Sequence, residues 1–386
     1  MLNNLSAVQR SIETARGLPN ALYVSEEDFK AEKSSVFAAN WTAIAFGKDV
    51  PQPGDAYPVR FTGSPLVVVR DNYDVIRVFH NVCRHRGMIL VEKPKRIAGV
   101  IRCAYHSWCY DMTGKLRSQP HAGGPGVNGH EALKKDELGL IEVRSHVWRD
   151  IVFVNLSGAA PAFEQYAGEL IARWSEYEQP LYHGGPDSSL SMELRSNWKL
   201  AVDNFCESYH LPWVHPGLNS YSRLEDHYTI MSSGGFSGQG TQVYNPILDP
   251  SGRELAQFSG LSQKWDHAAE YVALYPNTLL GVHKDHAFAI ILQPQAPDRT
   301  NERIELYYAD PEITAAEWSS LRAKNAELWR EVFAEDVGVC EGMQRGRLSD
   351  RFDGGRFSPA MDGSVHLFHA WIARQMTKPI GVVEAA

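Results

Sequence analysis

Two short segments that each pair a cysteine with a histidine constrain this chain more than any other feature. The first is Cys83-Arg-His85, and the second, Cys103-Ala-Tyr-His106, follows after residues 86–102. Each segment offers one thiolate and one imidazole nitrogen. A [2Fe-2S] cluster in which two thiolates bind one iron and two imidazoles bind the other needs this set of ligands. The sequence therefore predicts such a cluster and a role in electron transfer.

Structural zinc is the alternative, because two cysteines and two histidines also satisfy tetrahedral zinc. Each segment mixes one cysteine with one histidine, and Gly87 and Gly114 flank segments that strand-like runs carry. This pattern favours the cluster. Analysis of iron and acid-labile sulfide separates the two readings, and a zinc-stabilised binding protein stays the remote alternative to an enzyme.

The size and charge of the chain favour a small-molecule substrate. Its 386 residues suffice for two domains, and its hydrophobic content of 44% and charged content of 22% are ordinary for a globular protein. A net charge of −8 without any Lys/Arg block argues against a nucleic-acid partner. No apolar run approaches the roughly 20 residues of a membrane span. Five cysteines are too few for a disulfide framework, so we expect a cytoplasmic protein without a membrane partner.

Changes in pattern along the chain predict three segments. Residues 1–40 read as helical and are expected to pack on the catalytic domain, whereas residues 41–157 are β-rich and contain both Cys-His segments. Residues 158–386 combine strands with a long helix from about Thr314. This mixture predicts an α+β fold in which a helix lies on an antiparallel sheet.

A second group of metal-binding side chains lies in the third segment. Glu207 and His210 are three residues apart, which predicts one helical face, and Pro212 is expected to end that helix so that His215 turns back toward His210. A hydrogen-bonded core is the alternative for this histidine pair. An iron-sulfur module on the same chain favours a mononuclear Fe(II) that uses the electrons of the cluster.

Two histidines need a carboxylate to complete a facial triad that leaves positions open for dioxygen. On the helix predicted near residue 335, Asp336 shares the inward apolar stripe with Cys340 and Met343, whereas Glu335 lies on a face that looks solvated. We therefore assign the third ligand to Asp336. Asn204 is a candidate hydrogen-bond donor beside these ligands, with ordinary helix packing as the alternative.

The electrons are expected to come from another protein. Residues 232–240 form a glycine-rich stretch that reads as a loose loop, but it lacks the third glycine and the strand-turn-helix context of a dinucleotide-binding fingerprint. The chain is therefore not expected to bind NADH itself. A flavin- or ferredoxin-type reductase is the expected partner.

From about Trp41 through the C-terminal helix, these motifs resemble the Rieske non-haem iron oxygenase α-subunits, the ring-hydroxylating oxygenase family. The resemblance implies a Rieske domain before a helix-grip catalytic domain, usually in a homotrimer. It also implies that Glu207 links His106 of one subunit to His210 of the next and so carries electrons to the iron. Met88 and Tyr105 stand where electron-transfer Rieske proteins have two further cysteines, which favours the oxygenase branch.

The substrate class is also read from the resemblance. Glutamate at position 207 and the short Asn204–His210 spacing are similar to choline, glycine betaine and carnitine monooxygenases, which favours monooxygenation or N-demethylation of a small quaternary ammonium compound. A small aromatic acid is the alternative. Five aromatic residues are candidates for holding a cation on their ring faces. They are Tyr221, Tyr244, Trp265, Tyr271 and Tyr275.

Overall fold

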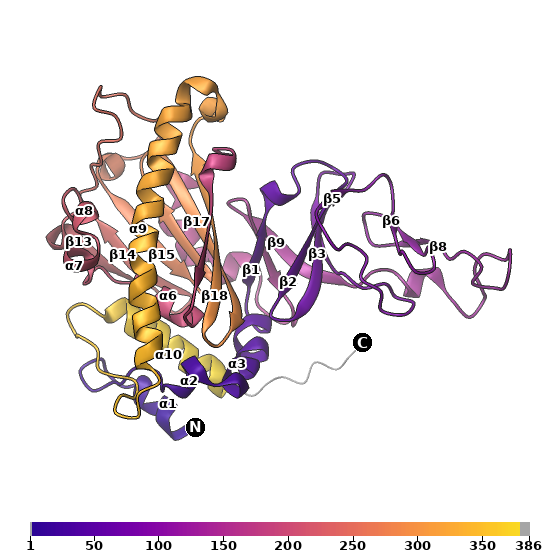
Figure 1. The fold of residues 1–386 in the computed structure, drawn as a ribbon, viewed down its shortest axis with the longest axis horizontal. Helices are drawn as coiled ribbons and strands as arrows, with labels where there is room; N and C mark the ends of the chain where they lie inside the picture. Colours follow the sequence, from indigo (N-terminus) through magenta and orange to yellow (C-terminus); the bar gives the residue numbers. More distant parts are fainter. Residues whose placement is uncertain (1, 379–386) are drawn as a thin grey trace. The chain divides into compact units, whose positions relative to one another are not determined.

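The computed structural model describes residues 2–378, and the chain divides into two compact units (Figure 1). The small unit contains residues 43–160, and the large unit contains residues 1–42 and 161–386. The sequence predicted changes of pattern near residues 41 and 158. The N-terminal segment belongs with the large unit.

The small unit is built on a seven-stranded sheet with the strand order β1-β10-β9-β4-β3-β2-β5. Its central strands are rich in β-branched residues, as in Val67-Val68-Val69, all of which are buried. The strands are β1 (Thr42–Phe46), β2 (Asp55–Phe61), β3 (Ser64–Arg70), β4 (Ile76–His80), β5 (Lys95–Arg96), β9 (Glu142–Trp148) and β10 (Ile151–Asn155).

A second, three-stranded sheet in the small unit carries the loop with the second Cys-His segment. Its strand order is β6-β7-β8, with β6 (Ile101–Arg102), β7 (Cys109–Tyr110) and β8 (Leu116–Ser118). Cys103 lies directly after β6 and Cys83 lies shortly after β4. Both cysteines belong to the hydrophobic core of this unit, together with Val67, Val69 and Phe79. The sulfur atoms are thus anchored in a packed interior.

The two Cys-His loops close with the same pair of backbone hydrogen bonds. The N–H of Cys83 donates to the carbonyl oxygen of Met88 at 2.8 Å, and the N–H of Gly87 donates to that of Cys83 at 3.1 Å. In the second loop, the N–H of Cys103 donates to the carbonyl oxygen of Trp108 at 2.8 Å, and the N–H of Ser107 donates to that of Cys103 at 3.0 Å. Gly87 has a φ of 75°, in the left-handed region that glycine adopts readily.

The large unit contains an eight-stranded sheet whose main order is β11-β18-β17-β16-β15-β14-β13, with β12 also paired to β18. The apolar run at residues 287–292 is buried and forms part of β17. The strands of this eight-stranded sheet are β11 (Tyr182–His183), β12 (Ser189–Leu194), β13 (His227–Met231), β14 (Phe236–Thr241), β15 (Ala269–Leu274), β16 (Thr278–Val282), β17 (His286–Ala296) and β18 (Arg299–Tyr308).

The expectation of a loose loop over residues 232–240 was wrong for most of that stretch. Residues 236–241 form β14, which pairs with both β13 and β15. Gly238 is needed there because a Cβ atom at that position would lie 2.0 Å from the carbonyl oxygen of Tyr271. The glycines of this stretch therefore belong to a buried strand, which the sequence alone presented as a turn signal.

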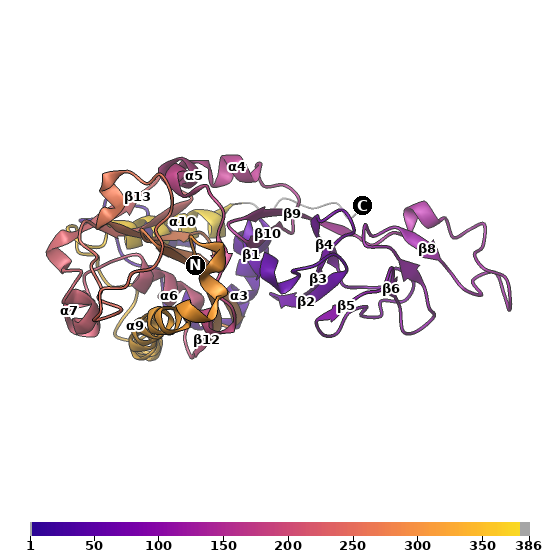
Figure 2. The same cartoon turned by 90° about the horizontal axis from the view of Figure 1, so that it is seen from above.

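Helices cover both faces of the large sheet. The long α9 helix passes along the sheet and packs on α6 and β12 (Figure 1), whereas α5 lies on the opposite face (Figure 2). The predicted long helix thus begins at Ser319. The helices are α1 (Leu2–Val8), α2 (Ala21–Val24), α3 (Glu26–Glu32), α4 (Phe163–Tyr166), α5 (Gly168–Arg173), α6 (Trp198–Phe205), α7 (Leu211–Val214), α8 (Pro216–Asn219), α9 (Ser319–Gly346) and α10 (Gly363–Thr377), with a π-helical turn at Lys33–Ala38.

A buried ion pair fixes α6 to the N-terminal helices. The Nζ of Lys199 lies 2.5 Å from Oε1 of Glu32, whose Oε2 accepts a hydrogen bond from the indole N–H of Trp198 at 2.9 Å. Burial raises the pKa of Glu32 and lowers that of Lys199, while the attraction between the two groups opposes both shifts. Breaking a buried pair of this kind leaves an unpaired charge, so the pair strongly restricts where α6 can lie.

The α+β class expected from the sequence is confirmed. A β-rich small unit accompanies a large unit in which a long helix lies on an antiparallel sheet. Among residues 2–378, no helix combines the length and the apolar composition that crossing a bilayer requires.

Two candidate metal centres

The four predicted cluster ligands separate into two buried sulfurs and two outward imidazoles. Cys83 and Cys103 are buried, whereas His85 is exposed and His106 is half-buried. The Nδ1 atoms of the two histidines lie 3.1 Å apart, and their rings approach edge to face. This grouping places two thiolates on the inner side and two imidazole nitrogens on the outer side, which suits a cluster with one sulfur-bound and one nitrogen-bound iron.

Burial changes the proton affinity of these groups. It raises the pKa of the Cys83 thiol, against an opposing hydrogen bond from Tyr110. It lowers the pKa of His85, as do the positive charges of His106 and Arg86. A neutral His85 keeps the nitrogen lone pair that a metal needs.

Aromatic rings flank both histidines. Trp108 is buried and stacks on His85 with a centroid separation of 4.8 Å and an interplanar angle of 9°. Tyr105 lies against His106 at 3.7 Å but is 55% exposed. Trp108 therefore covers one face of the exposed His85 ring, whereas Tyr105, itself largely exposed, lies against the half-buried His106.

Tyr110 is a residue beside the cluster that sequence reasoning missed. Its hydroxyl oxygen lies 3.2 Å from Sγ of Cys83 and accepts the backbone N–H of Arg84 at 3.0 Å. Burial raises its pKa well above the ordinary value, so the hydroxyl keeps its proton and can donate it to the sulfur. The pairing of β6 with β7 places Tyr110 opposite Ile101, in the core that also contains Cys83, and no local motif marks it.

The second centre brings His210, His215 and Asp336 together. One ligand atom from each lies within 4.8 Å of the others, and among the described residues this is the one group of its kind. Asp336 Oδ1 is 2.9 Å from Nε2 of His215 and 3.8 Å from Nε2 of His210. Asp336 comes from α9, and the histidines flank α7. Two imidazoles and one carboxylate thus converge on one point, as a facial triad requires.

The helix expected to carry Glu207 and His210 ends earlier than predicted. The α6 helix stops at Phe205, and both residues lie in the turn before α7. Pro212 stands in the first turn of α7, where its missing N–H costs nothing, and so does not terminate a helix. The turn nevertheless brings Glu207 Oε1 within 2.6 Å of Nδ1 of His210.

Each histidine of the triad is oriented by a glutamate. Glu207 accepts from Nδ1 of His210, and Oε2 of Glu335 lies 2.7 Å from Nδ1 of His215. Since a carboxylate can only accept, the Nδ1 atoms carry the protons and the bare Nε2 atoms face Asp336. Asp336 Oδ1 has no hydrogen-bond partner among the described residues. Lone pairs that face one another at 2.9 Å repel unless a cation lies between them, so these residues fit a metal ion.

Glu335 is exposed, as the helical stripe predicted, but the prediction missed its contact with the triad. Its side chain is 42% exposed, yet it holds the buried His215 through a hydrogen bond. Burial alone would lower the pKa of His215, but its interactions with the carboxylates of Asp336 and Glu335 raise it. The stripe did not reveal this contact because a long side chain at its border reaches a neighbouring loop.

A small cavity adjoins the triad and continues past Asp336. The outer part, of about 40 Å³, is lined by both histidines, and the inner part, of about 30 Å³, extends toward Cys340. Asn204, Phe205, Phe333 and Asp336 border both parts. Asn204 is therefore placed beside the triad, and its role as a hydrogen-bond donor stays a prediction.

The aromatic residues around the cavity differ from the expected set. Of the five predicted, Tyr271 lines the cavity, while Trp265 packs on Tyr177 and Tyr275 packs on Trp371. Tyr221 borders a surface pocket beside Glu335, and Tyr244 stacks on Trp329 from outside the cavity lining. Sequence reasoning missed four rings that do line it. These are Phe205, Phe288, Trp329 and Phe333.

Hydrogen bonds behind this aromatic wall hold it in place. The indole N–H of Trp329 donates to Nε2 of His286 at 2.9 Å, and Nδ1 of His286 is 2.6 Å from Asp285. The hydroxyl of Tyr271 is 3.2 Å from Nε2 of His283. The ring faces are thus fixed before any ligand arrives, which reduces the entropy that binding must lose.

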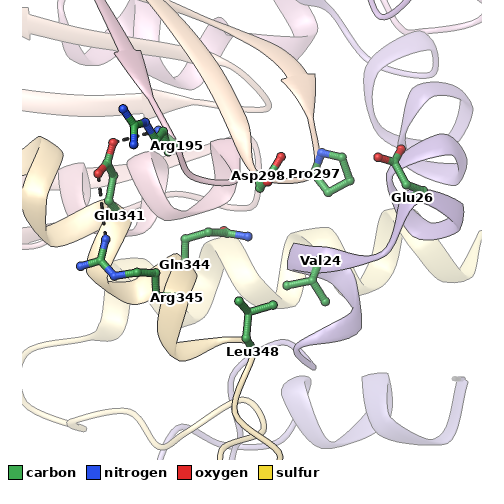
Figure 3. A pocket seen from close by; sticks show the side chains of 9 residues that line it. All are labelled: Val24, Glu26, Arg195, Pro297, Asp298, Glu341, Gln344, Arg345 and Leu348. Carbon is green, nitrogen blue, oxygen red and sulfur yellow. Dashed lines mark hydrogen bonds and ion pairs between the residues drawn. The ribbon is translucent and has the colours of Figure 1, made fainter.

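A larger surface pocket, of about 380 Å³, lies near the end of α9 (Figure 3). Two of its charged side chains interact with each other, since Glu341 lies 4.0 Å from Arg345 and also accepts the backbone N–H of Arg195. Among the described residues, no aromatic ring, histidine or cysteine lines it. The chemistry of the large unit therefore centres on the smaller cavity.

Comparison with known proteins identifies two domains in the chain. Residues 172–378 match the catalytic domain described as "Ring hydroxylating alpha subunit", and residues 40–135 match the Rieske [2Fe-2S] domain. The chain is 26% identical over 353 residues to the carnitine monooxygenase oxygenase subunit of Acinetobacter pittii (strain PHEA-2), covering 89% of this chain and 88% of that protein. It is 28% identical to the chloroplastic choline monooxygenase of Arabidopsis thaliana over 375 residues, 93% and 82% of the two chains.

Solved structures share the fold. A quaternary ammonium Rieske monooxygenase matches with a TM-score of 0.77 at 22% identity, covering 98% of this chain and 99% of that one. A naphthalene 1,2-dioxygenase matches with a TM-score of 0.73 at 19% identity, covering 96% and 95%. Each of the two domains therefore has the fold of known oxygenase structures.

The hydrogen bond from Tyr110 to Cys83 predicts a shift in the cluster potential. Replacing Tyr110 by Phe removes a donor to sulfur and so destabilises the reduced, more negative cluster. We expect the reduction potential to fall by tens of millivolts with the cluster content unchanged, as measured by a redox titration followed by electron paramagnetic resonance. Tyr105→Phe, on the exposed side, is the matched control. An unchanged potential in Tyr110→Phe would show that the hydroxyl does not donate to the sulfur.

The geometry of the triad predicts that Asp336 is needed to bind the mononuclear iron, which is one of three iron atoms expected per chain. In Asp336→Ala, the ratio of iron to acid-labile sulfide should fall from about 3:2 to about 2:2, because the cluster ligands are untouched. Metal analysis alongside the cluster absorption spectrum measures both quantities. The exposed Asp350→Ala controls for loss of a surface carboxylate. Retention of the third iron in Asp336→Ala would contradict the assignment.

Proposed function

The chain belongs to the ring-hydroxylating oxygenase α-subunit family, a Rieske-type terminal oxygenase with a [2Fe-2S] cluster and a mononuclear iron, and on this premise we propose that it oxidises a small quaternary ammonium compound. The reaction consumes dioxygen and electrons from a partner reductase. Its product is a hydroxylated or N-demethylated compound.

Each metal has its proposed set of ligands. Cys83, His85, Cys103 and His106 hold the cluster, and His210, His215 and Asp336 hold the iron. The cluster supplies single electrons, and ferrous iron with open coordination positions supplies dioxygen activation. The protein contributes the orientation of the ligands, through Glu207 and Glu335, and a confined apolar space beside them.

One observation carries the choice of substrate: rings line the cavity beside the triad, and no lysine or arginine does. Phe205, Tyr271, Phe288, Trp329 and Phe333 supply the rings, and the residues described along both parts of the cavity include no basic side chain other than histidine. Aromatic faces attract alkylammonium ions through their electron-rich π systems. The lining therefore complements a compact cation.

The relatives support the same choice. Carnitine monooxygenases and choline monooxygenases bear names that specify quaternary ammonium substrates, and this chain covers most of their length. A small aromatic acid, the alternative expected from the sequence, carries a negative charge and no positive one, so neither the ring faces nor a lysine or arginine among the described lining residues would hold its charge. A neutral arene fits an apolar lining as well. A dioxygenase relative named for naphthalene, 31% identical over 267 residues, makes this the second candidate.

We further propose a homotrimer in which Glu207 connects two metal centres. One carboxylate oxygen of Glu207 is bound to His210, and the carboxylate is 14% exposed, so it lies close to the surface. In the family arrangement, His106 of a partner subunit would contact this carboxylate. A hydrogen-bonded path from imidazole to carboxylate to imidazole would then carry the electron between subunits.

Oxygen uptake with a set of substrates tests the proposed function. With a surrogate reductase and NADH, we expect uptake to be stimulated by at least one of choline, glycine betaine and carnitine, with formation of a hydroxylated or demethylated product. Benzoate and naphthalene serve as the aromatic arm. Stimulation by an aromatic compound with none by the three cations would reject the proposal and favour the alternative.

Replacement of Glu207 by Gln tests the bridge. The amide cannot accept from two imidazoles at once, so reoxidation of the reduced cluster in a single turnover should slow roughly 10- to 100-fold while both metals remain. Stopped-flow absorption measures the rate. Glu335→Gln, which perturbs the other histidine, is the control. Equal rates per bound iron in wild type and Glu207→Gln would reduce Glu207 to a residue that positions His210.

A further inference from the structure

Glu302 is a buried acid on the wall of the catalytic cavity. It lies on β18 opposite Leu292 of β17 and opposite Met192 of β12. Cross-strand partners and alternate residues share a face, so Glu302 lies on the same face as Ile290 and Phe288, which line the cavity. It borders the inner part, together with Asn204, Phe205 and Asp336. An acid thus occupies a position where the alternation of the strand calls for an apolar residue.

The carboxyl group of Glu302 is unpaired within the part of the chain that the structure describes. The residue is 7% exposed, and neither a hydrogen bond nor an ion pair to its side chain is present among residues 2–378. Asp28 in α3 also has an Oδ2 atom without a hydrogen bond among the described residues, but four other buried acids of the large unit have partners. These pairs are Glu32 with Lys199, Glu270 with Arg173, Glu305 with His183 and Asp203 with His369.

Leaving this group unpaired destabilises the ligand-free protein. Burial, and next the negative charge of Asp336, raises its pKa to about 8. An unpaired acid in an apolar wall is costly in free energy, and a leucine would cost less. A ligand that enters the cavity and pairs with this acid would offset the cost of burying it.

The rest of the lining determines what that partner can be. The cavity holds carboxylate, imidazole, amide and aromatic groups but no lysine or arginine among its described residues. Because the pKa of Glu302 is raised to about 8, a bound cation would favour its ionised form, whereas an anionic ligand would disfavour that charge and a neutral arene would leave the acid unpaired. A cation satisfies the acid and also contacts the ring faces.

We propose that Glu302 is the counterion of the substrate's quaternary nitrogen and the residue that selects cationic over uncharged substrates. This inference rests on the proposed function and deepens it. The rings of Phe205 and Phe333 border both Glu302 and the triad, so a trimethylammonium group seated between them lies next to Asp336 and its two histidines. Glu302 thereby positions the N-methyl groups for oxidation, and it takes no part in the chemistry itself.

Paired ligands that differ only in charge test this role. Each cation is compared with the analogue in which carbon replaces the quaternary nitrogen: choline with 3,3-dimethylbutan-1-ol, glycine betaine with 3,3-dimethylbutanoate, and carnitine with 3-hydroxy-5,5-dimethylhexanoate. Calorimetric titration of the metal-loaded enzyme without reductase measures binding in the absence of turnover. In wild type, at least one cation should bind more tightly than its analogue.

Glu302→Gln removes the charge and keeps the size and the ability to donate a hydrogen bond. We expect the preference for the quaternary nitrogen over the matching carbon analogue to fall by roughly 10- to 100-fold, with affinity for the one uncharged analogue, 3,3-dimethylbutan-1-ol, nearly unchanged. Glu302→Asp should retain most of the preference, which shows that charge is the cause. Glu193→Gln, an exposed acid on β12, makes the same change in net charge outside the cavity and should have no effect. A thermal melt of each variant verifies the fold.

The outcomes separate the two proposals. If wild type prefers a cation and Glu302→Gln keeps that preference, the rings alone recognise the cation, and the role of Glu302 is rejected while the proposed function stands. If wild type shows no preference within any of the three pairs, both proposals fail. If Glu302→Gln lowers the binding affinity for the cation and for its analogue equally, the residue shapes the cavity and is not a counterion.

Discussion

The catalytic site of the large unit depends on one local interaction, the repulsion between ligand atoms that face one another. Two imidazoles turn their Nε2 atoms toward the same oxygen of Asp336, and two glutamates hold the Nδ1 protons on the far side of each ring. Without a cation, the facing lone pairs repel. The fold maintains this arrangement by holding α6 through the buried Glu32–Lys199 pair and by laying α9 along it. A divalent metal replaces this repulsion by coordination bonds. The fold therefore holds three ligand side chains close together that would repel one another without the metal.

The two Cys-His segments and the triad were predictable from the sequence because their chemistry is local. A thiolate and an imidazole within a few residues, repeated once, specify a ligand set whatever the surrounding fold. The two loops share one hydrogen-bond pattern although their Cys–His spacing differs by one residue. Asp336 could be selected by helical periodicity, since one face of α9 is apolar. The α+β class followed from the order of the elements. These inferences needed only the two periods of helix and strand and the known preferences of metals.

What the sequence did not reveal depends on strand register or on side-chain reach. Tyr110 meets Cys83 in a core built from separate strands, and Glu302 reaches the cavity through the pairing of β17 and β18. The early end of α6 and the contact of Glu335 with His215 depend on a turn whose course no local signal fixes. The ring faces were misassigned for the same reason, because aromatic residues mark a core without saying which cavity they face.

The central claim is that one chain holds paired irons in its small unit and a lone iron in its large unit. Iron, zinc and acid-labile sulfide should be measured on anaerobically purified protein, together with the electron paramagnetic resonance spectrum of the reduced form. We expect about three irons and two sulfides per chain and the signal of a cluster with mixed nitrogen and sulfur ligands. A colourless protein containing zinc and no sulfide, without that signal, would contradict the account.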